Sequence, residues 1–376
     1  MNEPACARKT GRKPIAVAVV VTVFLAAHAS TACAEVKYTV TALNHLGGYT
    51  TYAYDVNNVG QVVGLSYIPG QTRYHAFLYS GGVMSDLGTL GGYKSRAEGI
   101  NDSGQIAGYS EISTSSYATD SFCYSGGTMS SLPRLAQANS AQAFDINASG
   151  QMVGADVFFG APDTTKAVLY DHGTVTNLGT LGGASSVANA INDLGQVVGY
   201  SYTTGNVPHA FLYSGGTMAD LLGADGPSSY ASDINNAGQV VGYLSTGNYR
   251  AFLYDAGTVT DLGTLGGKIS YAYGINASGQ VVGSSTTDIN DLVSRAFLYE
   301  GGEMIDLNTL VDPTATLTLK VAYAINDSGQ IVGMGSLKTS GGTRAFLLTP
   351  VPEPGTFLLL AAGLAGMLRQ RIRNGK

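Results

Sequence analysis

The chain has 376 residues, of which 12% are charged, and a formal net charge of −6. Eight of its 20 basic residues and two of its 26 acidic residues lie outside residues 35–350, so this body keeps 12 basic and 24 acidic side chains and a net charge of −12. Such a body repels a phosphate backbone, which argues against a nucleic-acid partner. The body has one cysteine, Cys123, which excludes an internal disulfide and a paired-cysteine metal site.

The first 34 residues have the pattern of a secretory signal peptide. Four basic residues lie between positions 8 and 13, an apolar run follows at 15–27, and the small residues Ala32 and Ala34 come next. We predict cleavage after Ala34, with Glu35 as the mature N-terminus. The alternative is an uncleaved membrane anchor, although the apolar run is short for a full span.

The body contains a nine-residue phrase seven times, as in "INDSGQIVG" at 325–333. A second phrase, as in "HAFLYSGG" at 75–82, follows each copy, and a third, "VTDLGTLGG" at 259–267, recurs in stronger and weaker forms. The spacing between copies of the first phrase is 41 to 50 residues, measured at the glutamine: Gln61, Gln105, Gln151, Gln196, Gln239, Gln280 and Gln330. Internal repeats of this length indicate a solenoid, a propeller or an array.

Each repeat predicts four short strands: one ending at "IN", then "QVVGY", "AFLY" and "TVTDLGTL". A repeat of four strands is typical of a β-propeller blade. Because the repeat occurs seven times, we predict an all-β, seven-bladed β-propeller. The seventh unit lacks a fourth strand, and residues 36–48 resemble a fourth strand without the preceding three. The N-terminal strand is therefore expected to complete the last blade and close the ring. The alternative is an open β-repeat array.

The repeated "N-D-S-G-Q" phrase has the chemistry of a tight turn, because Asn and Gly adopt left-handed backbone conformations readily. We expect seven asparagines to hold the first hairpin of each blade: Asn57, Asn101, Asn147, Asn192, Asn235, Asn276 and Asn326. The glycine that ends "VVG" is expected to let neighbouring sheets approach closely. We interpret the phrase as scaffold. A calcium loop needs about six or more oxygens, so neither a metal nor another cofactor is predicted.

These phrases resemble those of the HAF-repeat family of extracellular proteins. "HAF" stands at residues 75–77 and 209–211, and the paired phrases cover nearly the whole body. Three other copies have Arg in place of His, so not every blade requires the histidine. The resemblance implies secretion and repeat architecture, and it supplies no catalytic residues.

The least repetitive segments are the expected loops between the second and third strands, on the face where propellers usually carry their site. Their aromatic residues, mixed with Ser, Thr and Asn, suit stacking and hydrogen bonding to sugars. The alternative is that these residues are solvent-exposed loop residues without a binding role, together with tyrosines that pack at strand edges. Our candidate ligand-binding residues are Tyr67, Tyr74, Tyr109, Tyr117, Phe158, Tyr202 and Tyr249.

The sequence shows no established catalytic motif, neither "HExxH" nor "GxSxG". Glycoside hydrolysis needs two carboxylates about 5–10 Å apart. Glu111 and Asp156, from consecutive repeats, are the candidates for such a pair.

The C-terminal sequence, residues 351–376, resembles a PEP-CTERM sorting signal. It contains Pro352, Glu353 and Pro354, an apolar segment at 355–368, and then Arg369, Arg371 and Arg373. The apolar segment is expected to insert transiently in the inner membrane with the arginines on the cytoplasmic side. The resemblance implies cleavage by an exosortase and display at the cell surface or in the extracellular matrix. An ordinary tail anchor is the alternative.

The sequence therefore predicts three parts: a signal peptide at 1–34, a repeat propeller at 35–350 and a sorting signal at 351–376. The expected function is a non-catalytic binding or structural module, with exopolysaccharide as the candidate partner. The first alternative is a carbohydrate-active enzyme, a glycosidase or lyase, on a propeller scaffold. Ice binding or adhesion is a weaker alternative.

Overall fold

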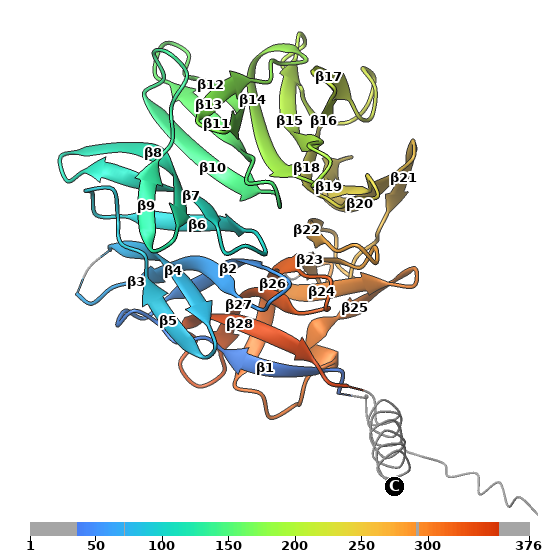
Figure 1. Cartoon of the computed structure of the whole chain (residues 1–376). Coiled ribbons are helices and arrows are strands. Elements are labelled where there is room, and N and C mark those ends of the chain that lie inside the picture. Colours follow the sequence, from blue (N-terminus) through green and yellow to red (C-terminus); the bar gives the residue numbers. More distant parts are fainter. Residues whose placement is uncertain (1–35, 71, 291–292, 353–376) are drawn as a thin grey trace, which may run out of the picture. The chain divides into compact units, whose positions relative to one another are not determined.

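A computed structural model describes residues 36–352 apart from residues 71 and 291–292. Within these residues the chain forms seven separate four-stranded antiparallel sheets, and one short 3-10 helix, η1 (Leu307–Thr309). Figure 1 shows the sheets following one another in chain order from blue to red. The predicted all-β, seven-bladed propeller is confirmed.

The blades contain consecutive strands, with one exception in blade 7. Blade 1 has β2 (Thr51–Val56), β3 (Val62–Tyr67), β4 (Tyr74–Ser80) and β5 (Val83–Asp86), and blade 2 has β6 (Ser95–Ile100), β7 (Ile106–Ser113), β8 (Ser116–Ser125) and β9 (Thr128–Ser131). Blade 3 has β10 (Ser140–Ile146), β11 (Met152–Phe158), β12 (Thr164–Asp171) and β13 (Thr174–Asn177), and blade 4 has β14 (Gly182–Ile191), β15 (Val197–Thr203), β16 (Pro208–Ser214) and β17 (Thr217–Asp220). Blade 5 has β18 (Ser229–Ile234), β19 (Val240–Ser245), β20 (Tyr249–Asp255) and β21 (Thr258–Asp261), and blade 6 has β22 (Ser270–Ile275), β23 (Val281–Thr286), β24 (Ser294–Glu300) and β25 (Glu303–Asp306). Blade 7 has β26 (Leu317–Ile325), β27 (Ile331–Leu337), β28 (Thr343–Pro350) and β1 (Tyr38–Ala42).

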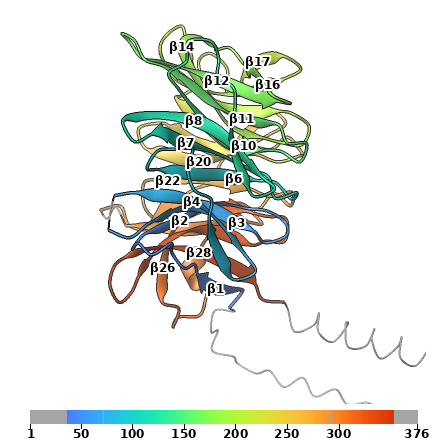
Figure 2. The ribbon, with the colours of Figure 1, turned by 60° about the vertical axis from the view of Figure 1, so that its left-hand side comes forward.

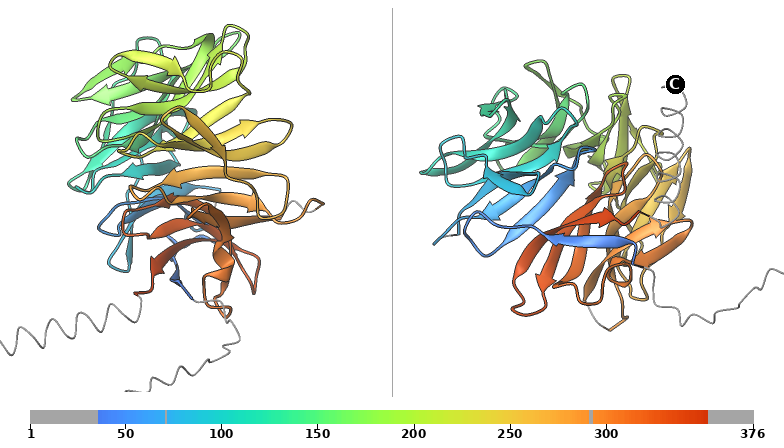
Figure 3. Two further views of the ribbon diagram at one scale, coloured as in Figure 1. Left: turned by 90° about the vertical axis from the view of Figure 1, so that its right-hand side faces the viewer. Right: turned by 60° about the horizontal axis from the view of Figure 1, so that its bottom comes forward.

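The exception closes the ring. β1 pairs antiparallel with β28, with Tyr38 opposite Pro350 and Ala42 opposite Phe346. Figure 1 shows blue β1 beside red β28, and the turned views of Figures 2 and 3 show the same neighbours. The predicted completion of the last blade by the N-terminal strand is confirmed. The first strands of successive blades contact one another all the way round, β26 against β2 included, so they form the inner wall.

The hydrophobic core lies between the sheets. One cluster joins Val63 and Ala76 of blade 1 to Ala97, Ile106 and Phe122 of blade 2, and the other blade junctions repeat this composition. Six third-strand phenylalanines are fully buried in this way: Phe77, Phe122, Phe211, Phe252, Phe297 and Phe346. Burial of each phenylalanine contributes about 2–3 kcal/mol. The second strand of each blade begins with three consecutive buried residues, so both of its faces are covered there, which explains the apolar run in each repeat.

The fourth strand is shorter than predicted. β21 ends at Asp261, and the "LGTL" that follows is a loop rather than strand. The Asp261 Oδ1 accepts the N–H of Gly263 at 2.8 Å, and Gly263 adopts a positive φ of 83°. A side chain that caps its own backbone two residues on turns the chain out of the sheet.

The glycine that ends "VVG" has a different role from the one predicted. A Cβ at Gly64 would lie 2.0 Å from the carbonyl oxygen of Tyr52, which belongs to the adjacent strand of the same blade. The pairing of β2 with β3 shifts register between Ala53 and Asp55, and this bulge recurs in every blade. The glycine therefore makes room for a bulge within its own sheet, not for a neighbouring sheet.

The repeated asparagines form a closed ring of hydrogen bonds. Each asparagine holds its own turn: Asn57 Oδ1 accepts the N–H of Gln61 at 2.9 Å, and its Nδ2 donates to Gln61 Oε1 at 2.8 Å. The same Nδ2 donates to the carbonyl oxygen of Asn101 in the next blade at 3.0 Å. Six further bonds of this kind complete the ring, from Asn101, Asn147, Asn192, Asn235, Asn276 and Asn326, the last of which donates to Asn57.

Replacing one ring asparagine by aspartate is expected to lower the free energy of unfolding by about 3 kcal/mol. In Asn192→Asp a carboxylate oxygen would face the Asn235 carbonyl oxygen and Gln196 Oε1, which now accept from Nδ2 at 3.1 and 2.8 Å. Urea denaturation measures the loss, and Asn248→Asp in an exposed turn is the matched control. Equal stability of the two variants would show that the ring bond contributes nothing.

Candidate functional site

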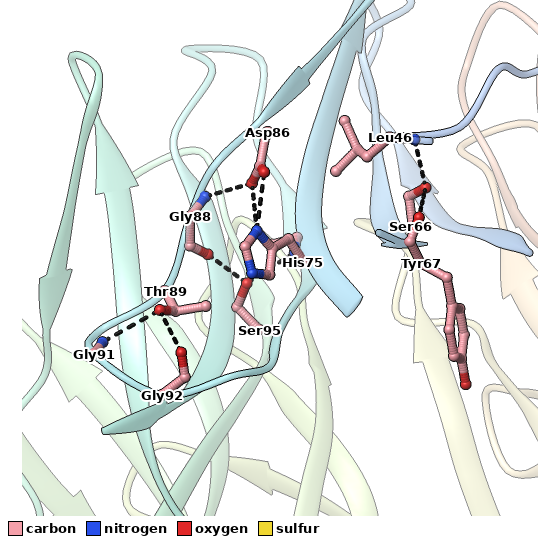
Figure 4. Close-up of polar contacts among 11 residues, drawn as sticks. Leu46, Ser66, Tyr67, His75, Asp86, Gly88, Thr89, Gly91, Gly92 and Ser95 are labelled. Atoms are coloured by element: carbon pink, nitrogen blue, oxygen red, sulfur yellow. Dashed lines mark hydrogen bonds and ion pairs between the residues drawn. The ribbon is translucent and has the colours of Figure 1, made fainter. Parts of the chain in front are cut away.

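The first residue of the second phrase pairs with a carboxylate of the fourth strand. His75 Nδ1 lies 2.9 Å from Asp86 Oδ2, and Figure 4 shows the imidazole pointing at that carboxylate. The equivalent pair in blade 4, between His209 and Asp220, is 2.6 Å long. In blade 5 an arginine makes the same contact with an aspartate, Asp261. His and Arg interchange at this position because either side chain can donate an N–H to the aspartate across the third and fourth strands.

The alanine of the same phrase ties neighbouring blades together. The Ala76 N–H donates to Ser95 Oγ at 2.8 Å. Ser95 Oγ in turn donates to the Gly88 carbonyl oxygen, as Figure 4 shows. Blades 3, 4 and 5 repeat the alanine-to-serine bond. The repeated phrases therefore stabilise the scaffold, and a site must be sought among residues that differ between repeats.

Such residues form a continuous group of tyrosines, which we call the tyrosine band. It consists of Tyr52, Tyr54, Tyr200, Tyr202, Tyr230, Tyr243, Tyr249, Tyr271, Tyr273 and Tyr323, with ring centres 4.9 to 6.3 Å apart along a chain of contacts. They come from the first and second strands of blades 1, 4, 5, 6 and 7, and from the third strand of blade 5. Nine rings are half-buried, and Tyr249 is 40% exposed. The band thus reaches solvent, unlike the buried phenylalanines between the sheets.

Blades 2 and 3 extend the band with an ion pair and two more rings. The guanidinium carbon of Arg96 lies 3.9 Å from the centre of the Tyr54 ring and 6.0 Å from that of Tyr109, which in turn contacts Phe144. Arg96 pairs with Glu98 two residues along the same strand. Burial raises the pKa of Glu98 to about 7, although Arg96 acts to lower it. A carboxyl that titrates near neutral pH beside aromatic rings is a candidate functional group.

Three aspartates lie on the inner wall, near the C-terminal ends of the first strands of blades 1, 3 and 5. Asp55 Oδ1 accepts the N–H of Val56 in its own blade, and its Oδ2 accepts the N–H of Ile100 in the next, both at 2.8 Å. Asp145 and Asp233 bridge blades 3–4 and 5–6 in the same way. These two aspartates and the asparagine ring line a cavity of about 230 Å³. The carboxylates satisfy unpaired N–H groups of the inner edges, which is a structural role.

The structure places all seven predicted ligand-binding residues on strands rather than on loops, so that part of the prediction is wrong. In blade 2 the second and third strands, β7 and β8, run on to a tight hairpin, whereas in the other blades these residues lie at strand ends that flank a longer loop. Tyr202 and Tyr249 belong to the tyrosine band, and Tyr109 adjoins it. Tyr67 and Tyr74 contact each other, with ring centres 5.5 Å apart. Tyr117 is 90% exposed on β8, and Phe158 is half-buried at the end of β11.

The two candidate catalytic carboxylates are engaged separately. Glu111 is buried, and its Oε2 accepts the N–H of Tyr93 at 3.0 Å. Asp156 is also buried and accepts the N–H of Leu135 at 2.6 Å and the hydroxyl of Tyr170 at 3.0 Å. Within the part of the chain that the structure describes, no hydrogen bond joins these two carboxylates.

The sequence analysis missed Arg96, Glu98 and most of the tyrosine band. Their signal was present in the first strands, where "TYAYDVN", "SRAEGIN" and "SYAYGIN" differ just before the repeated asparagine. Across residues 36–352 with their gaps, no group of three or more His, Cys, Asp and Glu side chains is placed to hold a metal ion. Burial raises the pKa of the Cys123 thiol, which packs against the cluster around Met152.

Residues 350–373 match the family model of the PEP-CTERM protein-sorting motif. The chain carries a PEP-CTERM sorting motif. The motif implies export and processing by an exosortase, with display at the surface or outside the cell. Pro352 is exposed at the end of the described residues, whereas the other predicted elements of the signal, and the cleavage residues Ala32 and Ala34, lie outside them. No described helix is long and apolar enough to span a membrane.

A comparison with curated proteins finds no match. Among solved structures, the β-propeller domain of the trilobed protease from Pyrococcus furiosus has a TM-score of 0.53 and 11% identity, over 79% of this chain and 94% of that domain. TolB from Acinetobacter baumannii has a TM-score of 0.45, 14% identity and coverage of 78% and 64%. Trypanosoma rangeli sialidase has a TM-score of 0.38, 10% identity and coverage of 78% and 59%. The first likeness supports the propeller fold alone; that domain is described as having an open velcro topology, whereas here β1 pairs with β28.

Proposed function

We propose that the protein is an exported propeller, displayed at the cell surface or in the extracellular matrix, that binds polysaccharide without cleaving it. In this proposal residues 1–34 direct export, residues 35–350 form a propeller of the HAF-repeat type, and residues 351–376 are processed by an exosortase. Exopolysaccharide is the proposed ligand. The observation that carries the proposal is the tyrosine band.

The band has the properties of a sugar-binding surface. Aromatic rings present flat apolar faces to the C–H groups of a sugar, and phenolic hydroxyls at their edges hydrogen-bond to its hydroxyls. Ten contacting rings over five blades offer several adjacent stacking positions, which suits a polymer better than a small molecule. The rings pack against one another, so binding costs little side-chain entropy.

The arrangement of carboxylates favours binding over cleavage. Glu111 and Asp156 already accept hydrogen bonds from backbone N–H groups, and each belongs to its own local network.

One observation favours the enzyme as the second candidate. Glu98 lies beside the band with a pKa raised to about 7 by burial, which suits a general acid at neutral pH. Adhesion or ice binding has no such supporting observation.

Calorimetry with the purified exopolysaccharide of the producing cells tests the proposal. The secreted protein is expected to release or absorb heat on mixing while reducing ends in the same sample stay constant. Tyr249→Ala, which removes the most exposed ring of the band, is expected to weaken binding about tenfold. Tyr49→Ala is the matched control, because Tyr49 is 86% exposed and its ring stacks on no ring of the band among the described residues.

Two results would contradict the proposal. If the protein binds no polysaccharide of the producing cells, the proposed function is wrong. New reducing ends that disappear in Glu98→Gln, with binding retained, would establish the enzyme instead.

A further inference from the structure

A second group of aromatic and charged residues surrounds a pocket between blades 1 and 2. The pocket has a volume of about 250 Å³, and its lining includes no residue of the tyrosine band. It is lined by Thr72, Arg73, Tyr93, Lys94, Glu111, Thr114, Ser115 and Tyr117, and we call it the blade 1–2 pocket. Pockets for drug-sized ligands measure about 300–1,000 Å³, so this one suits a single sugar unit of a chain that continues outside it.

Arg73 is held in place by an aromatic ring. Its guanidinium carbon lies 3.7 Å from the centre of the Tyr93 ring. A guanidinium stacked on a ring keeps the N–H groups at its edge free, and those groups match the two oxygens of a carboxylate. Among the described residues, no carboxylate lies within ion-pair distance of Arg73.

Lys94 adds a second positive charge. Its Nζ lies 3.9 Å from Glu111 Oε1 and 5.7 Å from the centre of the Tyr74 ring. Glu111 also accepts the N–H of Tyr93, so this carboxylate positions both the lysine and the residue that carries the Arg73 stack. Two cations and one anion leave the pocket positive within a body of net charge −12, which favours an anionic ligand over a neutral one.

The remaining lining residues suit a sugar ring. Tyr117 is 90% exposed and offers a free aromatic face at the rim. Thr114 and Ser115, in the turn between β7 and β8, add hydroxyls that donate and accept hydrogen bonds. Cations, a stacking face and hydroxyls together match a sugar that bears a carboxylate.

We propose that the blade 1–2 pocket binds the carboxylate-bearing units of an acidic polysaccharide. Arg73 and Lys94 bind the carboxylate, and Tyr117 covers the sugar ring. Glu111 is a positioning residue in this pocket. The inference rests on the proposed polysaccharide-binding function and adds a second contact that selects for charge.

Calorimetry of the secreted protein with hexagalacturonate and with its fully methyl-esterified form tests this pocket. The acid is expected to bind at least about tenfold more tightly than the ester, because esterification removes the charge-assisted hydrogen bonds. Arg73→Gln is expected to reduce that difference, because only Lys94 then remains to bind the carboxylate. Tyr117→Ala is expected to weaken the binding of both ligands. Because the Tyr117 side chain is exposed, its removal should not disturb folding, and misfolding would not explain the weaker binding. Arg295→Gln, on β24 and outside the pocket, is the matched control and should bind as the unchanged protein does.

The outcomes separate this inference from the proposed function. Equal affinity for acid and ester, or an Arg73→Gln variant whose preference for the acid is unchanged, would overturn the pocket assignment. If exopolysaccharide still binds and Tyr249→Ala weakens it, the proposed function stands without the pocket. If neither hexagalacturonate, nor its methyl ester, nor exopolysaccharide binds, both the pocket assignment and the proposed function are wrong.

Discussion

Deletion of residues 36–48 is expected to lower the free energy of unfolding by about 5 kcal/mol or more. The deletion removes β1, including the buried side chains of Tyr38 and Leu43, and uncovers Leu310 and Val311, which share a core cluster with Tyr38. It also turns β28 into an unpaired edge, which invites association between molecules. Urea denaturation and analytical ultracentrifugation of the deletion variant measure the two effects.

A rearranged chain separates ring closure from simple loss of residues. In blade 1 the third and fourth strands are joined by the Gly81–Gly82 turn, with Ser80 opposite Val83. In blade 7, Pro350 lies opposite Tyr38 in the same geometry. Moving residues 38–48 to follow Pro350 through two glycines should therefore restore most of the stability. An unstable rearranged chain, or a deletion variant as stable as the original, would contradict a role of β1 in closing the ring.

The fold could be predicted from the sequence because its determinants recur. Seven copies of one turn phrase fix the number of blades, and the missing fourth strand at one end matches the surplus strand at the other. The bulge before each asparagine could not be predicted in the same way. It is set by the fit between Gly64 and the carbonyl of Tyr52, which are twelve residues apart and meet only once β2 and β3 pair.

The candidate site was predictable only in part, since aromatic residues far apart in sequence meet across blades. Tyr54 and Tyr323 are neighbours only because the ring is closed. Tyr249 was found from its position after the second strand, whereas Tyr230 and Tyr271 lie in first strands that the repeat pattern marks as scaffold. Arg96 and Glu98 were missed for the same reason. Differences between copies of a repeat are therefore the better guide to its site than the repeat itself.

Between pH 4 and pH 8 the protein is expected to lose stability as the pH rises. An aspartate in the unfolded chain has a pKa of about 3.9. Burial raises the pKa of Asp55 to about 6 and that of Asp233 to about 7, and it raises that of Asp145 well above its usual value. The folded state therefore binds more protons than the unfolded chain in this range, and the free energy of unfolding falls with pH.

The stabilisation from Asp55 and Asp233 is fully present below about pH 4 and is lost as the pH rises through about 6 and about 7, respectively; for Asp55 alone it is on the order of 3 kcal/mol. Glu98 acts in the same direction, because its pKa is also raised to about 7 by burial. Asp86 acts oppositely: its pKa is lowered despite burial, since His75 and the Gly88 N–H donate to it. That contribution disappears only as the pH falls below about 4, so it does not mask the effect.

Urea denaturation at pH 5, 6, 7 and 8 measures this dependence. In Asp233→Asn one titrating group is removed, and the slope of stability against pH should become shallower even if the variant is less stable at every pH. The change in slope should exceed the change expected from the loss of one titrating group, because the charge of Asp233 also helps raise the pKa of Asp145. Asp288→Asn, at an exposed loop position, should leave the slope unchanged. Stability that increases from pH 5 to pH 8, or equal slopes in the two variants, would show that the inner-wall aspartates are accommodated as anions by the N–H groups they bridge.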